Sequence, residues 1–311
     1  MLPADVLRQV RRLHLRARRL VQTLLGGEYH SAFKGAGLSF EEVREYQPGD
    51  DVRTIDWNVT ARVGAPFIKR FVEERELTMV LAVDVSASQG FGTRQLTKRA
   101  AAAELAALLA LCAVSNNDRV GLLAFSSEVE RYVPPNKGPR HVLRLLRDIL
   151  AFDPKHPGTD LAAALDYLNK VQRRRAIVFL MSDFIGPDRP AQRNIDVPAG
   201  AVAKGFETAF RRAAHRHDLI AVRTSDPRER AWPAVGLVRL QDAETGRQVL
   251  VDTSSARVRA EFAANARARD EAFAKLARGC QADLIEAGTD GDHFDALLNF
   301  FRKRDRRRRH G

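Results

Sequence analysis

The sequence of 311 residues predicts an α/β fold, with a doubly wound, mostly parallel sheet and helices on both of its faces. Two observations predict it, and a third points to a site on it. From residue 77 onward, short apolar runs alternate with longer segments that suit helices, which is the pattern of a parallel sheet with crossover helices. The apolar runs, such as MVLAV at 79–83, contain no polar residue, as expected of strands buried on both sides. Two of them run into an aspartate, Asp84 and Asp183.

The alternation begins with a buried strand over 77–83 and an alanine-rich helix over 94–115. The apolar part of this helix is too short to span a membrane and contains Glu104, so it suits a buried helix of the core. DRVGLLAF and EVERYV predict two successive strands at 118–125 and 128–133. The first half of the domain therefore supplies one helix and three strands.

Helices are predicted next over 138–151 and 160–171, and the run AIVFLM predicts a buried strand at 176–181. A helix over 201–216 and a strand over 218–224 continue the alternation. The last part of the chain predicts a β-hairpin around a glycine-containing turn, a long helix, a short strand and a final helix, at 235–252, 254–278, 282–287 and 291–303.

The ends of the chain have a different character. Residues 1–25 predict a basic amphipathic helix, because apolar residues recur there at helical spacing. Residues 26–76 contain several glycines and show little periodicity, which indicates an irregular but ordered segment. Residues 301–311 form a basic tail, interpreted as solvated and disordered. The domain organisation is therefore the basic helix, the irregular segment, an α/β domain over 77–300, and the tail.

The net charge of +12 is concentrated at the two ends. Residues 1–20 carry six Arg against Asp5, and residues 302–310 carry seven Arg or Lys against Asp305. The body between them is nearly neutral, so a basic nucleic-acid-binding face on the folded domain is not indicated. Attraction of the basic ends to nucleic acid, to an anionic membrane surface or to an acidic partner is left open.

The compartment is predicted from cysteine use and from the missing targeting signals. Only Cys112 and Cys280 occur, so a disulfide framework is excluded and a reducing compartment is the simpler assumption. The N-terminus lacks the uninterrupted apolar stretch of a secretory signal, although its arginine content also suits a transit peptide. We therefore expect a cytoplasmic protein.

Polar side chains gather where the predicted strands end. Asp84, Ser86 and Ser88 follow the first strand in the run DVSAS, and Asp183 follows the third apolar strand in the run MSD. Thr159, in the run GTD, stands in the loop that opens the preceding helix. In a doubly wound sheet, ligands bind outside the carboxyl ends of the strands, where the winding direction reverses. These five side chains are therefore predicted to meet at one edge of the sheet.

The atoms of this set indicate a hard divalent cation. They are carboxylate and hydroxyl oxygens, which suit an octahedral Mg²⁺ or Mn²⁺ better than Zn²⁺ and leave at least one coordination position open. The alternative is structural: the hydroxyls cap helices and the carboxylates satisfy loop amides. A serine nucleophile fits less well, because the sequence around Ser86 is not G-x-S-x-G. Asp50, Asp51 and Asp56 could in principle form the metal site of a hydrolase, but a turn in which their side chains bind nearby backbone amides is the simpler interpretation.

The motifs DVSAS, GTD and MSD, in this order, resemble the metal-ion-dependent adhesion site of von Willebrand factor A-like domains. The segment HSAFKGAGLSFEEVREYQPGDDVRTIDWNVTARVGAPFIKRFVEERE, at 30–76, is similar to the signature of the bacterial "domain of unknown function 58" family, which precedes an A-like domain. The hairpin LVRLQDAETG also resembles an insertion of that family. The resemblance covers about residues 26–300.

The resemblance implies a binding module, in which an acidic side chain of a partner protein completes the cation's shell. It implies that Asp84, Ser86 and Ser88 are ligands from the first loop, Thr159 from the second, and Asp183 from the third, through water. It also implies work with a MoxR-type AAA+ ATPase, as an adaptor in the maturation or metal loading of client proteins. The runner-up function is a metal-dependent hydrolase that uses the same oxygens.

Two features of the sequence stand beside this resemblance. Gln89 follows the second serine where members of the family often carry Met, which affects the expected loop conformation. A second group of polar residues lies in the signature segment, where it predicts either a buried network that braces the first strand or a surface for a partner. Its members are Arg44, Asp50, Asp51, Arg53, Asp56 and Trp57.

Overall fold

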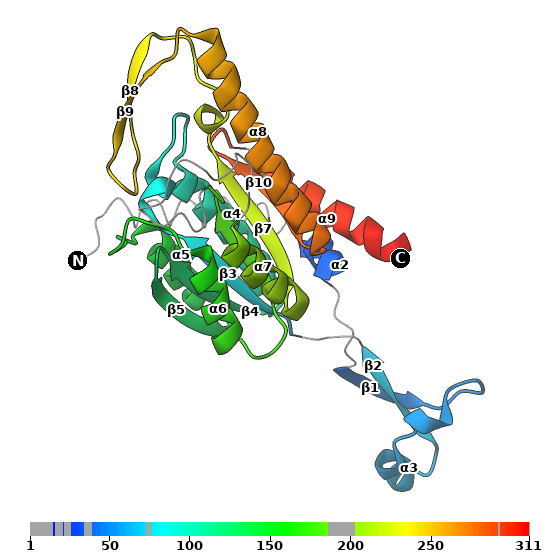
Figure 1. The fold of residues 1–311 in the computed structure, drawn as a ribbon. Helices are drawn as coiled ribbons and strands as arrows, with labels where there is room; N and C mark the ends of the chain where they lie inside the picture. The colour runs from blue at the N-terminus through cyan, green and yellow to red at the C-terminus, as the bar shows by residue number, and fades with distance from the viewer. Residues whose placement is uncertain are drawn as a thin grey trace.

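A six-stranded sheet forms the centre of the computed structural model, which describes Leu15, Val21 and residues 26–33, 39–72, 76–185, 203–291 and 293–310. The strand order is β10-β7-β6-β3-β4-β5 (Figure 1). The pairs along this order are parallel, except that the edge strand β5 runs antiparallel to β4. The fold class predicted from the sequence is therefore confirmed. The strands are β3 (Thr78–Asp84), β4 (Arg119–Phe125), β5 (Val129–Asn136), β6 (Ile177–Ser182), β7 (Asp218–Ser225) and β10 (Asp283–Gly288).

The winding direction of the sheet reverses at β3. From β3 the chain moves outward to β4 and β5, and it then returns across β3 to β6, β7 and β10. The carboxyl ends of β3, β4 and β6 consequently lie side by side at the reversal, which is where an open sheet of this kind binds ligands.

Helices cover both faces of the sheet and divide the core in two (Figure 1). One face is covered by α2 (Gly26–Phe33), α4 (Lys98–Ser115), α5 (Pro139–Leu150) and α9 (His293–His310). The other face is covered by α6 (Leu161–Val171), α7 (Lys204–Arg216) and α8 (Ala256–Gly279).

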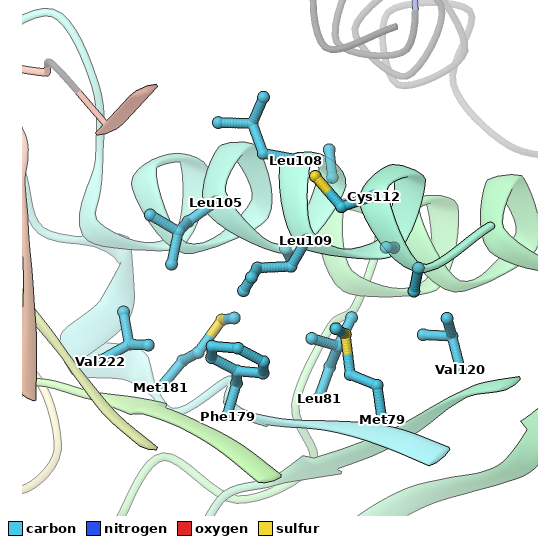
Figure 2. Packing of buried hydrophobic residues seen from close by; sticks show 14 of the residues in the cluster. Met79, Leu81, Leu105, Leu108, Leu109, Cys112, Val120, Phe179, Met181 and Val222 are labelled. Carbon is cyan, nitrogen blue, oxygen red and sulfur yellow. The ribbon is translucent and has the colours of Figure 1, made fainter. Parts of the chain in front are cut away.

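Strand β3 shows why the strands are apolar throughout. Met79, Leu81 and Val83 pack in the core beneath α4, whereas Val80 and Ala82 pack in the core on the opposite face. Because successive side chains of a strand point to opposite faces, a strand covered on both sides has no position for a polar residue. Figure 2 shows the first of these cores, with Leu105 and Leu109 of α4 facing the side chains of β3 and β6.

The helices begin close to their predicted positions, with one informative shift. Helix α4 was predicted from residue 94 but begins at Lys98, because the side chain of Thr97 caps it by accepting a hydrogen bond from the backbone N–H of Ala100. The shift places Lys98 in the first turn of the helix, at the carboxyl edge of the sheet.

Residues 39–72 correct the prediction of an irregular segment. They form an antiparallel hairpin of β1 (Ser39–Glu45) and β2 (Phe67–Val72), whose connection contains the short helices η2 (Val52–Thr54) and α3 (Trp57–Val63). Figure 1 shows this hairpin apart from the central sheet. The strand SFEEVRE carries few apolar residues, so the alternation that identifies a half-buried strand is weak in the sequence.

The basic end of the chain corrects a second prediction, because α9 continues to His310 and the end is not a disordered tail. Arg304 explains part of this order. Its guanidinium group lies 4.6 Å from the ring centroid of Phe33 and pairs with Asp218 and Asp283, which begin β7 and β10. Arg307 also pairs with Asp283. Arg304 and Arg307, whose charges favoured the interpretation of a solvated tail, instead attach the segment to the sheet.

The late hairpin was predicted correctly, and it consists of β8 (Leu237–Gln241) and β9 (Gln248–Asp252) paired antiparallel. Figure 1 shows it extending from the long helix α8, with its turn near the start of α4. The predicted helix over 1–25 lies outside the described residues except for Leu15 and Val21, of which Val21 packs into the first core. No helix in the described part of the chain is long and apolar enough to cross a membrane.

Candidate cation site at the carboxyl edge of the sheet

The loop after β3 turns its two serines toward one point. Asp84 ends the strand, is 1% exposed, and accepts a hydrogen bond from the backbone N–H of Ser86 at 2.9 Å. The hydroxyl oxygens of Ser86 and Ser88 lie 3.1 Å apart. Ser86 precedes the short helix η3 (Ala87–Gly90), but its side chain makes no capping hydrogen bond there. The structural alternative thus holds for Asp84, which binds a loop amide, and not for the side chain of Ser86.

Asp183 joins the end of β6 to the same group. Its Oδ2 atom accepts a hydrogen bond from the hydroxyl of Ser88 at 3.1 Å, and its Oδ1 atom accepts one from the backbone N–H of Ile185 at 3.0 Å. The hydroxyl of Ser182 donates to Oδ2 of Asp84 at 2.7 Å, which links the first and third loops from the other side. Four of the five predicted ligands therefore belong to one connected group of polar atoms.

Thr159, the fifth predicted ligand, comes from the loop before α6. The backbone N–H of Ala87 donates to the carbonyl of Pro157 at 3.0 Å, so this loop lies against the first one. Asp160, and not Thr159, caps α6 with its side chain. The hydroxyl of Thr159 donates instead to Oε1 of Glu244, at 2.8 Å, a residue of the turn between β8 and β9. The structure thus brings a carboxylate from a distant hairpin to the predicted site.

The edge also holds a buried ammonium group, that of Lys98 at the start of α4. Its Nζ atom lies 2.5 Å from Oδ2 of Asp183 and 2.6 Å from Oε1 of Glu229, which ends the short helix η4 (Pro227–Glu229) after β7. Burial acts to lower the pKa of Lys98, but the negative charges of Asp183 and Glu229 outweigh it and raise this pKa. Lys98 is therefore a charged group that neutralises part of the edge.

The carboxyl groups outnumber this ammonium group. Burial raises the pKa of Asp84 to about 7, and the negative charge of Asp183 adds to the rise. Burial also raises the pKa of Glu229 and of Glu244, and Asp183 again contributes to both shifts. Four carboxyl groups thus share the edge with Lys98, and the charge of Asp183 opposes the ionisation of the other three.

Arg99 lies nearby, but its guanidinium group binds main-chain carbonyl groups. Its guanidinium group donates to the carbonyl oxygens of Val85, at 2.9 Å, and of Phe152, at 2.8 Å. It therefore fixes the first loop to the segment that leads to Thr159, and it is directed at main-chain carbonyls instead of at the carboxylates.

The donor set fits a hard divalent cation. An octahedral Mg²⁺ with oxygens at about 2.1 Å has neighbouring ligands about 3.0 Å apart, which is close to the separations of 3.1 Å from Ser88 to Ser86 and to Asp183. Among the described residues, no three His, Cys, Asp or Glu side chains are placed to hold a metal ion by themselves. A cation at this edge therefore depends on the hydroxyl groups, as the sequence pattern implies.

Sequence reasoning missed several groups at this edge, namely Lys98, Arg99, Ser182, Glu229 and Glu244. Ser182 had a signal, since it immediately precedes Asp183 in the quoted motif. Lys98 and Arg99 stand out only as charges before an alanine-rich helix. Glu229 and Glu244 had no local signal, because their contacts with Lys98 and Thr159 join residues 131 and 85 positions apart.

Gln89, the departure from the family pattern, is buried behind the serine loop. Its Oε1 atom accepts a hydrogen bond from the hydroxyl of Thr224 at 3.0 Å, while its Nε2 atom is buried without a partner. The side chain points to β7 and makes no contact with the serine hydroxyls among the interactions described. The substitution consequently leaves the predicted ligands in place.

The second group of predicted residues lies in the 39–72 hairpin. Arg44 pairs with Asp50 at 2.7 Å, and Asp51 and Asp56 accept hydrogen bonds from backbone N–H groups at the starts of η2 and α3. Trp57 is 69% exposed, and Arg53 is exposed as well. The contacts described for the polar members are local turn and cap contacts, which do not support the network interpretation, and the alternative of a surface for a partner stays a prediction.

Comparison with known proteins agrees with the resemblance seen in the sequence. The family model described as "Protein of unknown function DUF58" matches residues 42–272. The chain belongs to the DUF58 family. Uncharacterized proteins of Mycobacterium tuberculosis and Mycobacterium bovis are 34% identical over 301 residues, which covers 96% of this chain and 89% of theirs.

Solved structures with a similar fold have much lower identity. The conserved hypothetical protein BatB from Bacteroides thetaiotaomicron is 14% identical with a TM-score of 0.45, covering 74% of this chain and 99% of that chain. A von Willebrand factor type A structure from Catenulispora acidiphila is 11% identical with a TM-score of 0.40, covering 77% of this chain and 43% of that chain. The family membership rests on the family model and the mycobacterial relatives.

Proposed function

We propose that this DUF58 protein binds Mg²⁺ or Mn²⁺ at the carboxyl edge of its sheet and uses the cation to dock an acidic side chain of a partner protein. The observation that carries the proposal is the connected group of oxygens on Ser86, Ser88 and Asp183, beside the buried carboxyl of Asp84. These oxygens have the spacing of neighbouring cation ligands and stand in an excess of negative charge.

The proposed ligands are of two chemical kinds. Ser86, Ser88 and Thr159 offer neutral hydroxyl oxygens, and Asp84 and Asp183 offer the negative charge. When bound, the cation would act as a Lewis acid, and its open coordination position could accept a carboxylate from outside the site. Because the three hydroxyl ligands carry no charge, they leave the cation more attractive to a further anionic ligand than carboxylates in their place would.

The position of the site on the fold supports a docking role. Its members come from loops at the rim of the sheet, while the strands that carry them are rigid and buried. A cation held there would be anchored by the core, with Ser88 and Thr159 as its partly exposed ligands, on loops that a rigid scaffold positions. This arrangement needs no group that activates a nucleophile, and a binding function is therefore preferred to hydrolysis by the same oxygens.

The partner proposed is a MoxR-type AAA+ ATPase together with a client protein, in the cytoplasm. The identity of this partner comes from the family resemblance alone, while the chemistry of the site supports only an acidic side chain as the partner's contribution. The protein would then act as an adaptor in the maturation or metal loading of its client.

The cation step is tested by thermal unfolding and calorimetric titration with Mg²⁺ and Mn²⁺. A ligand at a hundred times its Kd stabilises a protein by about 2.7 kcal/mol, so the unmutated protein should melt several degrees higher with cation. Asp84→Asn should abolish this gain. Asp118→Asn, which changes a carboxyl that is equally buried at the opposite edge, should keep it. A melting temperature that does not respond to either cation would contradict the proposal.

A further inference from the structure

The turn between β8 and β9 is built to present Glu244. Oδ1 of Asp242 accepts hydrogen bonds from the backbone N–H groups of Glu244 and Thr245, at 2.8 and 2.9 Å, and the backbone N–H of Asp242 donates to the carbonyl of Arg247 at 2.9 Å. Gly246 completes the turn at a φ of 70°, in the left-handed region. The turn is therefore ordered by its own hydrogen bonds, independently of the site that it approaches.

Glu244 differs from the rest of the hairpin in its surroundings. It is half-buried, whereas the other residues of 241–250 are exposed, including Leu250 at 63%. The apolar side chains of the hairpin therefore do not attach its tip to the body. The contact that brings the tip to the sheet is polar, between Glu244 and the hydroxyl of Thr159.

The second oxygen of Glu244 lies beside the backbone of the Thr159 loop. A methyl group built on Gly158 would lie 3.8 Å from Oε2 of Glu244, so this oxygen is adjacent to the backbone of the Thr159 loop. Asp183 and Lys98 are also close enough to act on Glu244 electrostatically. A side chain at the tip of a distant hairpin is thus placed among the groups proposed to surround the cation.

The half-buried position of Glu244 places its carboxyl group where burial and the charge of Asp183 both oppose its ionisation. Lys98 is already shared between Asp183 and Glu229. A hydrogen bond from Thr159 offsets part of the repulsion, and a divalent cation would convert the remainder into attraction.

We infer that Glu244 is an internal ligand of the cation site, occupying the position that the proposed function gives to the acidic side chain of a partner. The inference rests on that proposed function and adds a regulatory step to it. A partner carboxylate binds only when the hairpin tip moves away, so its apparent affinity is reduced by the fraction of molecules in which the tip is bound. The hairpin acts as a built-in competitor for the site.

Hydrogen-exchange mass spectrometry on the full chain tests this inference, with Mn²⁺ as the probe. In the unmutated protein, Mn²⁺ should slow exchange at the backbone amides of residues 237–252. Glu244→Gln keeps an oxygen that can accept from Thr159 but removes the charge, so this slowing should be lost. Glu261→Gln changes an exposed carboxyl on α8 and should behave as the unmutated protein does.

A second readout tests competition for the open position. Acetate serves as the carboxylate probe, and bound Mn²⁺ broadens the NMR line of its methyl protons when acetate reaches the metal. Glu244→Ala should broaden this line several-fold more than the unmutated protein or Glu261→Gln at the same Mn²⁺ occupancy. A tip that exchanges equally in all three proteins with Mn²⁺ bound, or equal broadening, would overturn the inference alone. Absence of Mn²⁺ binding to the unmutated protein would overturn the proposed function and the inference with it.

Discussion

Both edges of the central sheet contain buried carboxylates, but the positive charges and hydrogen-bond donors around these carboxylates differ between the edges. At the amino edge, Asp118 is 3% exposed and accepts hydrogen bonds from the hydroxyl of Tyr29 and the backbone N–H of Leu77. Asp218 and Asp283, at the same edge, share the guanidinium group of Arg304. Each of these carboxylates has a donor or a cation that belongs to the fold, so this edge is complete without a ligand.

At the carboxyl edge the carboxyl groups outnumber the positive charge that neutralises them. Asp183 is buried to the same degree as Asp118, but it shares Lys98 with Glu229 and lies near Asp84 and Glu244. Buried carboxylates without enough positive charge destabilise a protein. The charges of the amino edge are matched within the fold, whereas those of the carboxyl edge are not, and the proposed cation would supply the missing positive charge.

The largest effect should come from Lys98→Met. Breaking a buried ion pair by removing one partner costs about 3–5 kcal/mol, since Asp183 and Glu229 lose the charge that neutralises them. Mg²⁺ should restore more stability to this variant than it adds to the unmutated protein, because it replaces the lost charge. Urea unfolding with and without Mg²⁺ measures both quantities. An equal gain in the two proteins would show that the cation binds elsewhere.

A smaller loss is expected from Arg304→Met at the amino edge. This change removes a half-buried charge from Asp218 and Asp283 and its contact with the ring of Phe33, which should cost about 2–3 kcal/mol. The melting-temperature gain from Mg²⁺ should be unchanged. A loss of the Mg²⁺ response in this variant would mean that the two edges are coupled and that the comparison fails.

The amino edge should also show a pH dependence through His217. Burial lowers the pKa of this imidazole to about 4, and the charges of Arg216 and Arg175 add to the shift. An unfolded histidine titrates near about 6.5, so the unfolded chain binds the proton first and the unfolding free energy falls as pH drops below that value. The loss stops below the folded pKa. Between pH 7.5 and 5.5 it should be about 1 kcal/mol.

Urea unfolding at these two pH values checks the effect of His217. The comparison is with His217→Asn, which cannot titrate, and the difference between the two proteins isolates the histidine from the carboxyl groups. A variant that loses as much stability as the unmutated protein would exclude His217 as the source.

The smallest effect is expected from Gln89→Met, the replacement that the family resemblance suggests. The buried Nε2 atom has no partner, so its removal offsets the loss of the hydrogen bond from Thr224. The unfolding free energy should change by less than about 1 kcal/mol, and the Mg²⁺ response should persist. A lost response would show that the amide side chain fixes the loop of Ser86 and Ser88.

The same two edges show what the sequence could predict. The strands and the positions of Asp84 and Asp183 follow from local patterns, because an apolar run of strand length and the acid after it are contiguous in the chain. Lys98, Glu229 and Glu244 could not be assigned in this way, since their contacts are made by elements that the fold brings together. The sequence locates the loops of the site, while its charge balance depends on the tertiary structure.

The errors have a common physical origin. The basic C-terminal segment was interpreted as disordered because its charges suit water, but Arg304 packs on Phe33 and pairs with carboxylates at the starts of two strands. Residues 39–72 were interpreted as irregular because of their glycines and weak periodicity, to which the charges of the strand SFEEVRE contribute. The environment of a charged residue is hard to predict from sequence, since only the fold decides whether its side chain is solvated or pairs with another charge.

The central claim, that the carboxyl edge holds a divalent cation, is tested most directly by a crystal structure of the full chain grown with Mn²⁺. Anomalous scattering locates the metal independently of any assumed ligand. The account predicts an anomalous peak in contact with the hydroxyl oxygens of Ser86 and Ser88, beside Asp183. No peak at saturating Mn²⁺, or a peak away from this edge, would contradict it.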